Sequence, residues 1–212
     1  MIIMFPASFV AQDSARAMLH TGGGTWLNES PAPNSSAIFE NDLIQTQKFA
    51  SAKIDAEGSM AIVHPETMVQ FEGDELALDH GHLEVNTSRN MKVRVNCITI
   101  TPLSSDRTHY DVTDVNGKVQ VAAIQNDVRI HYSGGSAEWS KQAAKLDTTV
   151  HQGEQVTREE RCGSAYVPGD AVDARGPILN STWAKIAGTG IVATLTCLGV
   201  CRGDDPISPS GP

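Results

Sequence analysis

The chain has 212 residues, and its 16 Lys and Arg against 25 Asp and Glu give a formal net charge of −9. This acidic balance excludes a nucleic-acid binder and polybasic docking on anionic lipid, because both need a basic face. Charged residues make up only 19% of the chain, and its length is sufficient for a buried core. We therefore expect one folded domain with tails, and neither an acidic disordered chain nor a disulfide miniprotein.

The first eleven residues, MIIMFPASFVA, form an apolar run that the polar residues QDS follow at once. The run resembles the centre and cleavage end of a secretory signal, although the positively charged start is missing and Phe9 is a poor residue near a cleavage position. We expect segment 1–11 to be a truncated signal segment. A short buried N-terminal strand is the alternative.

The body, residues 20–157, consists of short stretches in which apolar and polar residues alternate. Such a period of two is typical of half-buried strands. The alternating stretches are 53–56, 68–71, 83–85, 92–95, 97–101, 110–113, 118–121 and 127–130. Turn-forming residues lie between them at 57–59, 79–81 and 104–106, and Asn116-Gly117 is the strongest signal of a tight hairpin. This spacing predicts an all-β sandwich, barrel or solenoid.

Beyond the body, we expect a linker over 158–182, a hydrophobic helix over 183–201 and a disordered tail over 202–212. Residues 186–201 contain no charge. As a helix they would span about 24 Å, short of the roughly 30 Å hydrocarbon core. Starting at Trp183 lengthens the helix and includes Lys185, whose ammonium group can reach the headgroups. We expect a single-pass membrane anchor, with a buried helix of a soluble core as the alternative.

Several pieces of the body, in this order, resemble the FecR-domain family. They are GTWLN at 24–28, NDLIQT at 41–46, AKIDAEGS at 52–59, IVHP at 62–65, LALDHGHLEV at 76–85, TITP at 99–102, GKVQV at 117–121 and GEQV at 153–156. Asn41 stands where the family usually has Gly, which a turn position tolerates. The resemblance implies an extracytoplasmic β domain, a β-solenoid or twisted sandwich, without catalysis of its own.

The best-known members of this family are membrane transducers that report on outer-membrane receptors to a sigma factor. In them a cytoplasmic sigma-binding domain precedes the membrane helix and the β domain. Here the order is reversed, and residues 202–212 are too few to fold as a sigma-binding domain. The resemblance therefore does not carry sigma regulation to this chain.

Asp79-His80-Gly81-His82 is the one sequence cluster with the residue types of a metal site. Two histidines two apart on a strand share a face and can share a cation. However, the sequence places no third ligand, and Gly81 falls in a predicted turn. We expect surface imidazoles there and no metal site or cofactor. The remaining histidines, His20, His64, His109, His131 and His151, are scattered singly and predicted to lie at the surface or at sheet edges.

No catalytic motif occurs, and the carboxylate pairs Glu159-Glu160 and Asp204-Asp205 are interpreted as solvated charge, so we expect no enzyme activity. Of the four cysteines, Cys97 and Cys162 would both meet an oxidising compartment in an exported chain. A Cys97–Cys162 disulfide and two separate thiols both fit the sequence. Cys197 and Cys201, four residues apart, share one face of the expected helix.

The sequence thus predicts a non-catalytic, membrane-anchored module of the bacterial envelope that binds a protein or an envelope polymer and acts as a signalling scaffold. One alternative is an envelope sensor that acts through a partner membrane protein. Another is a cell-wall carbohydrate-binding module, which needs exposed aromatic rings. The aromatic residues available for that role are Trp26, Phe71, Tyr110, Tyr132 and Trp139.

Overall fold

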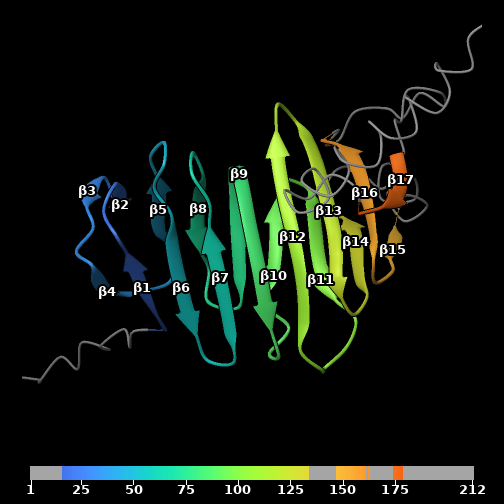
Figure 1. Ribbon diagram of the computed structural model, residues 1–212, viewed down its shortest axis with the longest axis horizontal. Coiled ribbons are helices and arrows are strands. Elements are labelled where there is room, and N and C mark those ends of the chain that lie inside the picture. Colours follow the sequence, from blue (N-terminus) through green and yellow to red (C-terminus); the bar gives the residue numbers. More distant parts are fainter. Residues whose placement is uncertain (1–15, 134–146, 161, 163–173, 179–212) are drawn as a thin grey trace, which may run out of the picture. The chain divides into compact units, whose positions relative to one another are not determined.

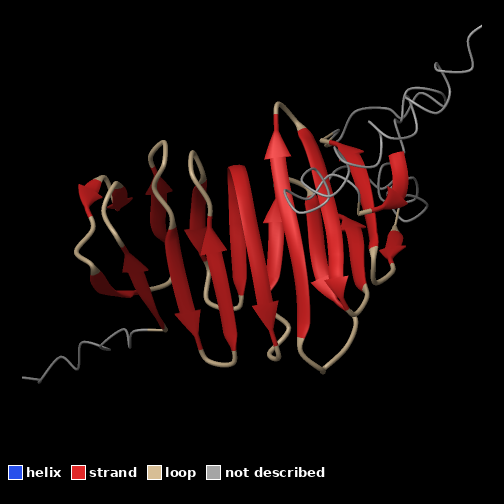
Figure 2. Cartoon of the chain, in the orientation of Figure 1, coloured by secondary structure: helices blue, strands red, loops and turns tan. Residues whose placement is uncertain are grey.

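The computed structural model describes residues 16–133, 147–160, 162 and 174–178, and every described element is a β-strand (Figure 2). The chain divides at Arg175, and the sheets described below lie within the first unit, Met1–Arg175. The all-β prediction is confirmed. No helix within the described ranges is long and apolar enough to cross a bilayer. The signal segment 1–11, the anchor helix 183–201 and the tail 202–212 lie outside the described residues, as does most of the linker.

The strands form two sheets that face each other (Figure 1). Sheet A has the order β4-β1-β6-β7-β9-β12-β13-β16. Its strands are β4 (Ser35–Ile38), β1 (Ala17–Thr21), β6 (Ala52–Ala56), β7 (Ser59–Val63), β9 (Glu75–Thr87), β12 (Thr108–Val115), β13 (Lys118–Gln125) and β16 (Glu154–Glu159).

Sheet B has the order β3-β2-β5-β8-β9-β10-β11-β14-β15. Its further strands are β3 (Ser30–Pro31), β2 (Thr25–Leu27), β5 (Asp42–Thr46), β8 (Met68–Phe71), β10 (Lys92–Val95), β11 (Ile98–Pro102), β14 (Val128–Tyr132) and β15 (Thr148–Val150). A last strand, β17, spans Ala174–Pro177. Among the register pairs above, β9 with β10 is parallel and the others are antiparallel.

Strand β9 joins the two sheets. Its first half pairs with β8 and β10 in sheet B, and its second half pairs with β7 and β12 in sheet A. The inward-facing residues change parity between the halves, from Leu76 and Leu78 to Leu83 and Val85. The residues 79–81, predicted as a turn, are therefore the point where a continuous strand crosses between sheets. This corrects the sequence prediction.

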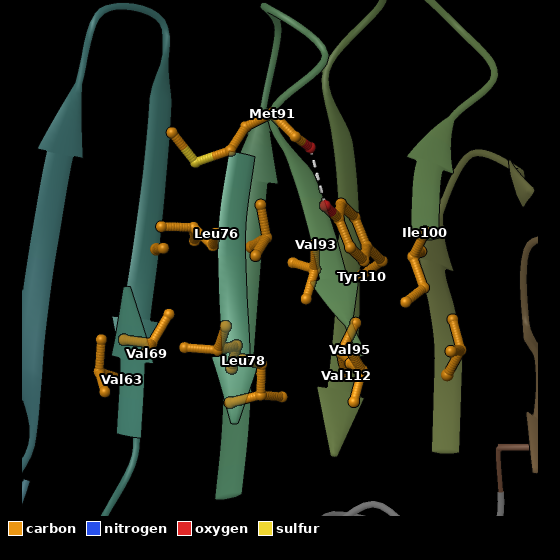
Figure 3. Close-up of a cluster of buried hydrophobic side chains, with 14 of the residues drawn as sticks. Val63, Val69, Leu76, Leu78, Met91, Val93, Val95, Ile100, Tyr110 and Val112 are labelled. Atoms are coloured by element: carbon orange, nitrogen blue, oxygen red, sulfur yellow. Dashed lines mark hydrogen bonds between the residues drawn. The ribbon is translucent and has the colours of Figure 1, made fainter. Parts of the chain in front are cut away.

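The core lies between the sheets, where the alternating apolar residues of both meet (Figure 3). Tyr110 is fully buried and donates a hydrogen bond from its hydroxyl to the carbonyl oxygen of Met91 at 2.8 Å. Each large side chain buried in this way contributes about 1.5–3 kcal/mol. Figure 3 shows Val93, Val95 and Val112 beside Tyr110, from strands of both sheets.

The predicted hairpin at Asn116-Gly117 is confirmed, because both residues have positive φ, 55° and 71°, as a type I′ turn requires. Asn41 also has a positive φ, of 72°. Asparagine tolerates this left-handed conformation better than most residues with a side chain.

Candidate functional site

A cluster of three histidines and two carboxylates lies on the outer face of sheet A. His64 follows β7, His82 and Glu84 belong to β9, and His109 and Asp111 belong to β12. The ladder places Glu84 directly opposite Asp111, with His82 opposite Thr113 and His109 opposite Asn86. Since outward positions on neighbouring strands lie side by side, the register brings all five side chains into one patch. We call these five residues the sheet A cluster.

Glu84 takes part in two of the four close contacts within the sheet A cluster. One of its carboxylate oxygens lies 2.9 Å from Nε2 of His109, and the other lies 3.7 Å from Nε2 of His64. The rings of His64 and His82 stack with centroids 4.0 Å apart and planes at 7°. Nε2 of His82 is 3.8 Å from a carboxylate oxygen of Asp111. One ligand atom each of Glu84, His109 and Asp111 can be grouped within 4.8 Å of one another.

Burial shapes the electrostatics of the cluster. It lowers the pKa of His64, the adjacent His82 lowers it further, and the carboxylates of Glu84 and Asp111 oppose the change. Nε2 of His64 and Oδ1 of Asp111 are shielded from solvent, yet neither has a hydrogen-bond partner within the described part of the chain. The cluster thus holds polar atoms whose capacity for hydrogen bonding is not used within the described part of the chain.

The predicted pairing of His80 with His82 on one face is not what the structure shows. Gly81, with a φ of 106°, separates the two halves of β9, so the alternation of faces does not continue through it. His80 bonds the Asp79 carboxylate at 2.9 Å, whereas His82 stacks on His64. The sequence analysis singled out one member of the sheet A cluster, His82, as a candidate metal ligand and missed the other four. The available signal was that these residues occupy outward positions on or beside strands with alternating apolar residues.

Asp79 belongs to a second group, with Asp114 and Glu160. Burial and the nearby Asp79 carboxylate raise the pKa of Asp114, while His80 and the backbone N–H of Gly117 oppose the shift. Burial, followed by the charges of Asp114 and Asp79, also raises the pKa of Glu160. Glu159 and Glu160, which the sequence analysis interprets as solvated charge, are both half-buried. Asp79 and Glu160 also line a groove of about 470 Å³.

Strand β4 forms one end of sheet A, at the left of Figure 1. In the described part of the chain it pairs with β1 alone. The N–H of Thr21 donates a hydrogen bond to the carbonyl oxygen of Asn34, so these two residues form a hydrogen-bonded pair of the β1–β4 ladder. Because such pairs alternate along an antiparallel ladder, the backbone groups of Ser35 and Ala37 point away from β1.

The other residues singled out in the sequence fall into three sets. The sequence left open whether Cys97 and Cys162 form a disulfide or remain separate thiols. They form a disulfide, with Cα atoms 5.6 Å apart. His20, His131 and His151 each pair with one carboxylate at the surface, as predicted. Phe71, Tyr110 and Tyr132 are buried and cannot stack on sugar rings, while Trp26 is half-buried. Trp139 lies outside the described residues.

No family model matches the chain, and no curated protein does. Among solved structures, the chain is similar to a proposed anti-sigma factor from Parabacteroides distasonis ATCC 8503, at 11% identity and a TM-score of 0.45. The similarity covers 64% of this chain and 59% of that one, so it spans less than two thirds of that protein.

Proposed function

We propose that the chain is a non-catalytic binding module of the bacterial envelope that captures an extended segment of a protein partner on strand β4 and so acts as a signalling scaffold. The open edge of β4 is the observation that carries this proposal. A strand edge offers unpaired N–H and C=O groups, and an extended peptide can add to it as a further strand.

The composition of β4 suits this role. Its residues Ser35, Ser36, Ala37 and Ile38 include no charge and no proline, the two devices that most often block an edge. The opposite end of sheet A differs, because β16 carries Glu154, Arg158 and Glu159. The end of sheet B at β3 has only two residues and contains Pro31. Within the described part of the chain, β4 is thus better suited to pairing than the ends at β16 and β3.

Two exposed apolar side chains favour a protein partner over a polar polymer. Met18 on β1 lies directly opposite Ala37 of β4 and is 39% exposed. Phe39, immediately after β4, is 38% exposed. An incoming strand that hydrogen-bonds to Ser35 and Ala37 can cover both with its own apolar residues. We therefore expect the occupant to be an uncharged, extended segment with apolar side chains.

The Cys97–Cys162 disulfide supports a location outside the cytoplasm, because disulfides persist mainly in oxidising compartments. We propose that the β domain is exported and tethered by a single helix over 183–201. Protease added to intact spheroplasts tests this. The proposal expects the β domain to be digested from outside while a membrane-bound fragment survives. A protease-protected, non-sedimenting chain would overturn both the export and the anchor.

Photo-cross-linking in the source bacterium tests the binding role. A photoreactive residue at Ser35 is expected to give one adduct of defined mass with another protein. The matched control is the same residue at Arg129, an exposed position on β14 of sheet B. An adduct of equal yield from Arg129 would contradict docking at the edge. An adduct with a second copy of the chain would replace the proposed partner by self-association.

The substitution Ala37→Pro then separates strand addition from mere proximity. Proline removes the outward N–H of Ala37 and leaves the bonds between β4 and β1 in place, as edge strands permit. We expect the Ser35 adduct to disappear while cooperative thermal unfolding is retained. If the adduct persists in the folded variant, strand addition at β4 is wrong.

A further inference from the structure

We propose that the sheet A cluster binds one divalent transition-metal ion of the Zn²⁺ class, with Glu84, His109 and Asp111 as ligands and His64 and His82 beside them. This inference goes beyond the proposed function and uses none of the β4 residues. It can therefore fail or hold independently of protein binding.

The spacing of the ligand atoms fits one ion. Zn²⁺ binds imidazole nitrogen and carboxylate oxygen at about 2.0–2.2 Å, so two ligand atoms of one ion lie at most about 4.4 Å apart. Glu84, His109 and Asp111 offer three such atoms within 4.8 Å of one another. Side-chain shifts of a few tenths of an ångström close that difference. Because the three residues stand on the adjacent strands β9 and β12, the backbone already fixes their relative positions.

The charge distribution calls for a cation. Glu84 and Asp111 are directly opposite each other across the β9–β12 ladder. Like charges in this arrangement destabilise a sheet. No Lys or Arg in the described part of the chain forms an ion pair with either carboxylate, and their ion-pair partners there are the three histidines. A dication between the two carboxylates would offset their formal charge of −2.

A second, independent observation comes from the unused polar atoms. Oδ1 of Asp111 and Nε2 of His64 are shielded from water and lack hydrogen-bond partners within the described residues. Leaving such atoms unsatisfied costs free energy, and native proteins rarely do so. An ion held by Asp111 would satisfy its oxygen. His64, 3.7 Å from the Glu84 oxygen, would then complete the coordination or orient that carboxylate.

The donor set selects the class of ion. Imidazole nitrogens favour Zn²⁺, Ni²⁺ and Cu²⁺, whereas Ca²⁺ takes six to eight oxygen ligands and Mg²⁺ retains most of its water. Three histidines around two carboxylates therefore favour a Zn²⁺-like ion over Ca²⁺ or Mg²⁺. The two thiols that remain in the sequence, Cys197 and Cys201, are the competing Zn²⁺ ligands that an experiment must exclude.

Isothermal titration of Zn²⁺ into the full chain, made without an oligohistidine tag and freed of metal by a chelator, tests the proposal. We expect saturable binding of one ion per chain, no competition from an excess of Ca²⁺ or Mg²⁺, and unchanged binding in the Cys197→Ser/Cys201→Ser variant. Binding that is absent, that Ca²⁺ competes for equally or that the cysteine variant loses would overturn the proposed site.

Variants of the cluster locate the ion. Glu84→Gln keeps the shape of the side chain but removes its charge, and His109→Gln removes the imidazole. Each is expected to weaken Zn²⁺ binding by about tenfold or more. His151→Gln is the matched control, because the imidazole of His151 contacts a single carboxylate, that of Asp127, at 2.9 Å. Circular dichroism confirms that each variant is folded. Equal losses in the control, or full binding by either folded cluster variant, would contradict the assignment.

Discussion

A β-carbon at Gly81 would lie 2.5 Å from the Cα atom of Thr67. Thr67 also fixes β9 where it crosses between the sheets, because the Oγ1 atom of Thr67 accepts a hydrogen bond from the N–H of His82 at 2.9 Å. Gly81 also has a φ of 106°, which residues with a side chain rarely adopt. The passage of one strand between two sheets thus depends on a residue without a side chain at this point.

Gly81→Ala is therefore expected to destabilise the protein by about 3 kcal/mol, through steric overlap and backbone strain together. Gly153→Ala is the matched control, because Gly153 also has a positive φ, 84°, but has no atom within 4 Å of an added β-carbon. We expect the control to cost only about 1 kcal/mol. Urea unfolding measures both. Equal losses in the two variants would show that Thr67 does not constrain the crossing.

The sequence predicts where the strands of this fold lie better than it predicts which strands pair with one another. Period-two patterns located β6, β8 and β10, and Asn116-Gly117 located a hairpin, because these signals depend on adjacent residues alone. The sheet A cluster depends on register. Only the pairing of β9 with β12 sets Glu84 opposite Asp111, and nothing near either residue in the sequence specifies that pairing. Strict alternation along the strand would also place His80 and His82 on the same face. The change of face at Gly81 separates them.

Tyr110→Phe tests the hydrogen bond that crosses the core. The substitution leaves the buried carbonyl of Met91 without its partner, which costs about 1–3 kcal/mol. Tyr132→Phe is the control, because the Tyr132 hydroxyl makes no hydrogen bond to any residue described, and it is expected to cost less. Denaturant titration compares the two. A smaller loss for Tyr110→Phe than for Tyr132→Phe would contradict this role.

Burial also raises the pKa of the Tyr110 hydroxyl. A raised value in the folded state means that unfolding releases a proton once the pH exceeds the ordinary tyrosine value of about 10. The contribution of Tyr110 to stability is thus complete below that pH and is lost as the pH rises above it. We expect Tyr110→Phe to lose part of the alkaline decline in unfolding free energy that the unsubstituted chain shows. An identical decline in both would contradict the assignment.

The Cys97–Cys162 disulfide closes a loop between residues 65 apart in sequence. A cross-link of this span restricts the unfolded chain and is worth about 4 kcal/mol in the chain-entropy model. We expect the double variant Cys97→Ser/Cys162→Ser to lose about that much in urea unfolding. Reductant should destabilise the unsubstituted chain but leave the double variant unchanged. A response of the double variant to reductant would assign the stabilisation to other thiols.

Asp114 makes the stability of the fold depend on pH in the opposite direction to an ion-paired carboxylate. Its pKa is raised by burial and by the Asp79 carboxylate, so the folded state holds the proton more tightly than the unfolded state. The sign follows directly: the contribution of Asp114 is fully present below the ordinary carboxyl value, about 3.9, and is lost as the pH rises through the folded value. At neutral pH, folding must therefore bury a disfavoured charge.

Asp114→Asn is thus expected to raise the melting temperature at pH 7 by a few degrees, because asparagine carries no charge and still accepts the hydrogen bond from the Gly117 N–H. The gain should shrink as the pH falls towards 4, where Asp114 is increasingly protonated. Asp74→Asn, at an exposed position, is the control and should leave the melting temperature nearly unchanged. A gain independent of pH, or one matched by Asp74→Asn, would mean that net charge rather than the burial of Asp114 governs the effect.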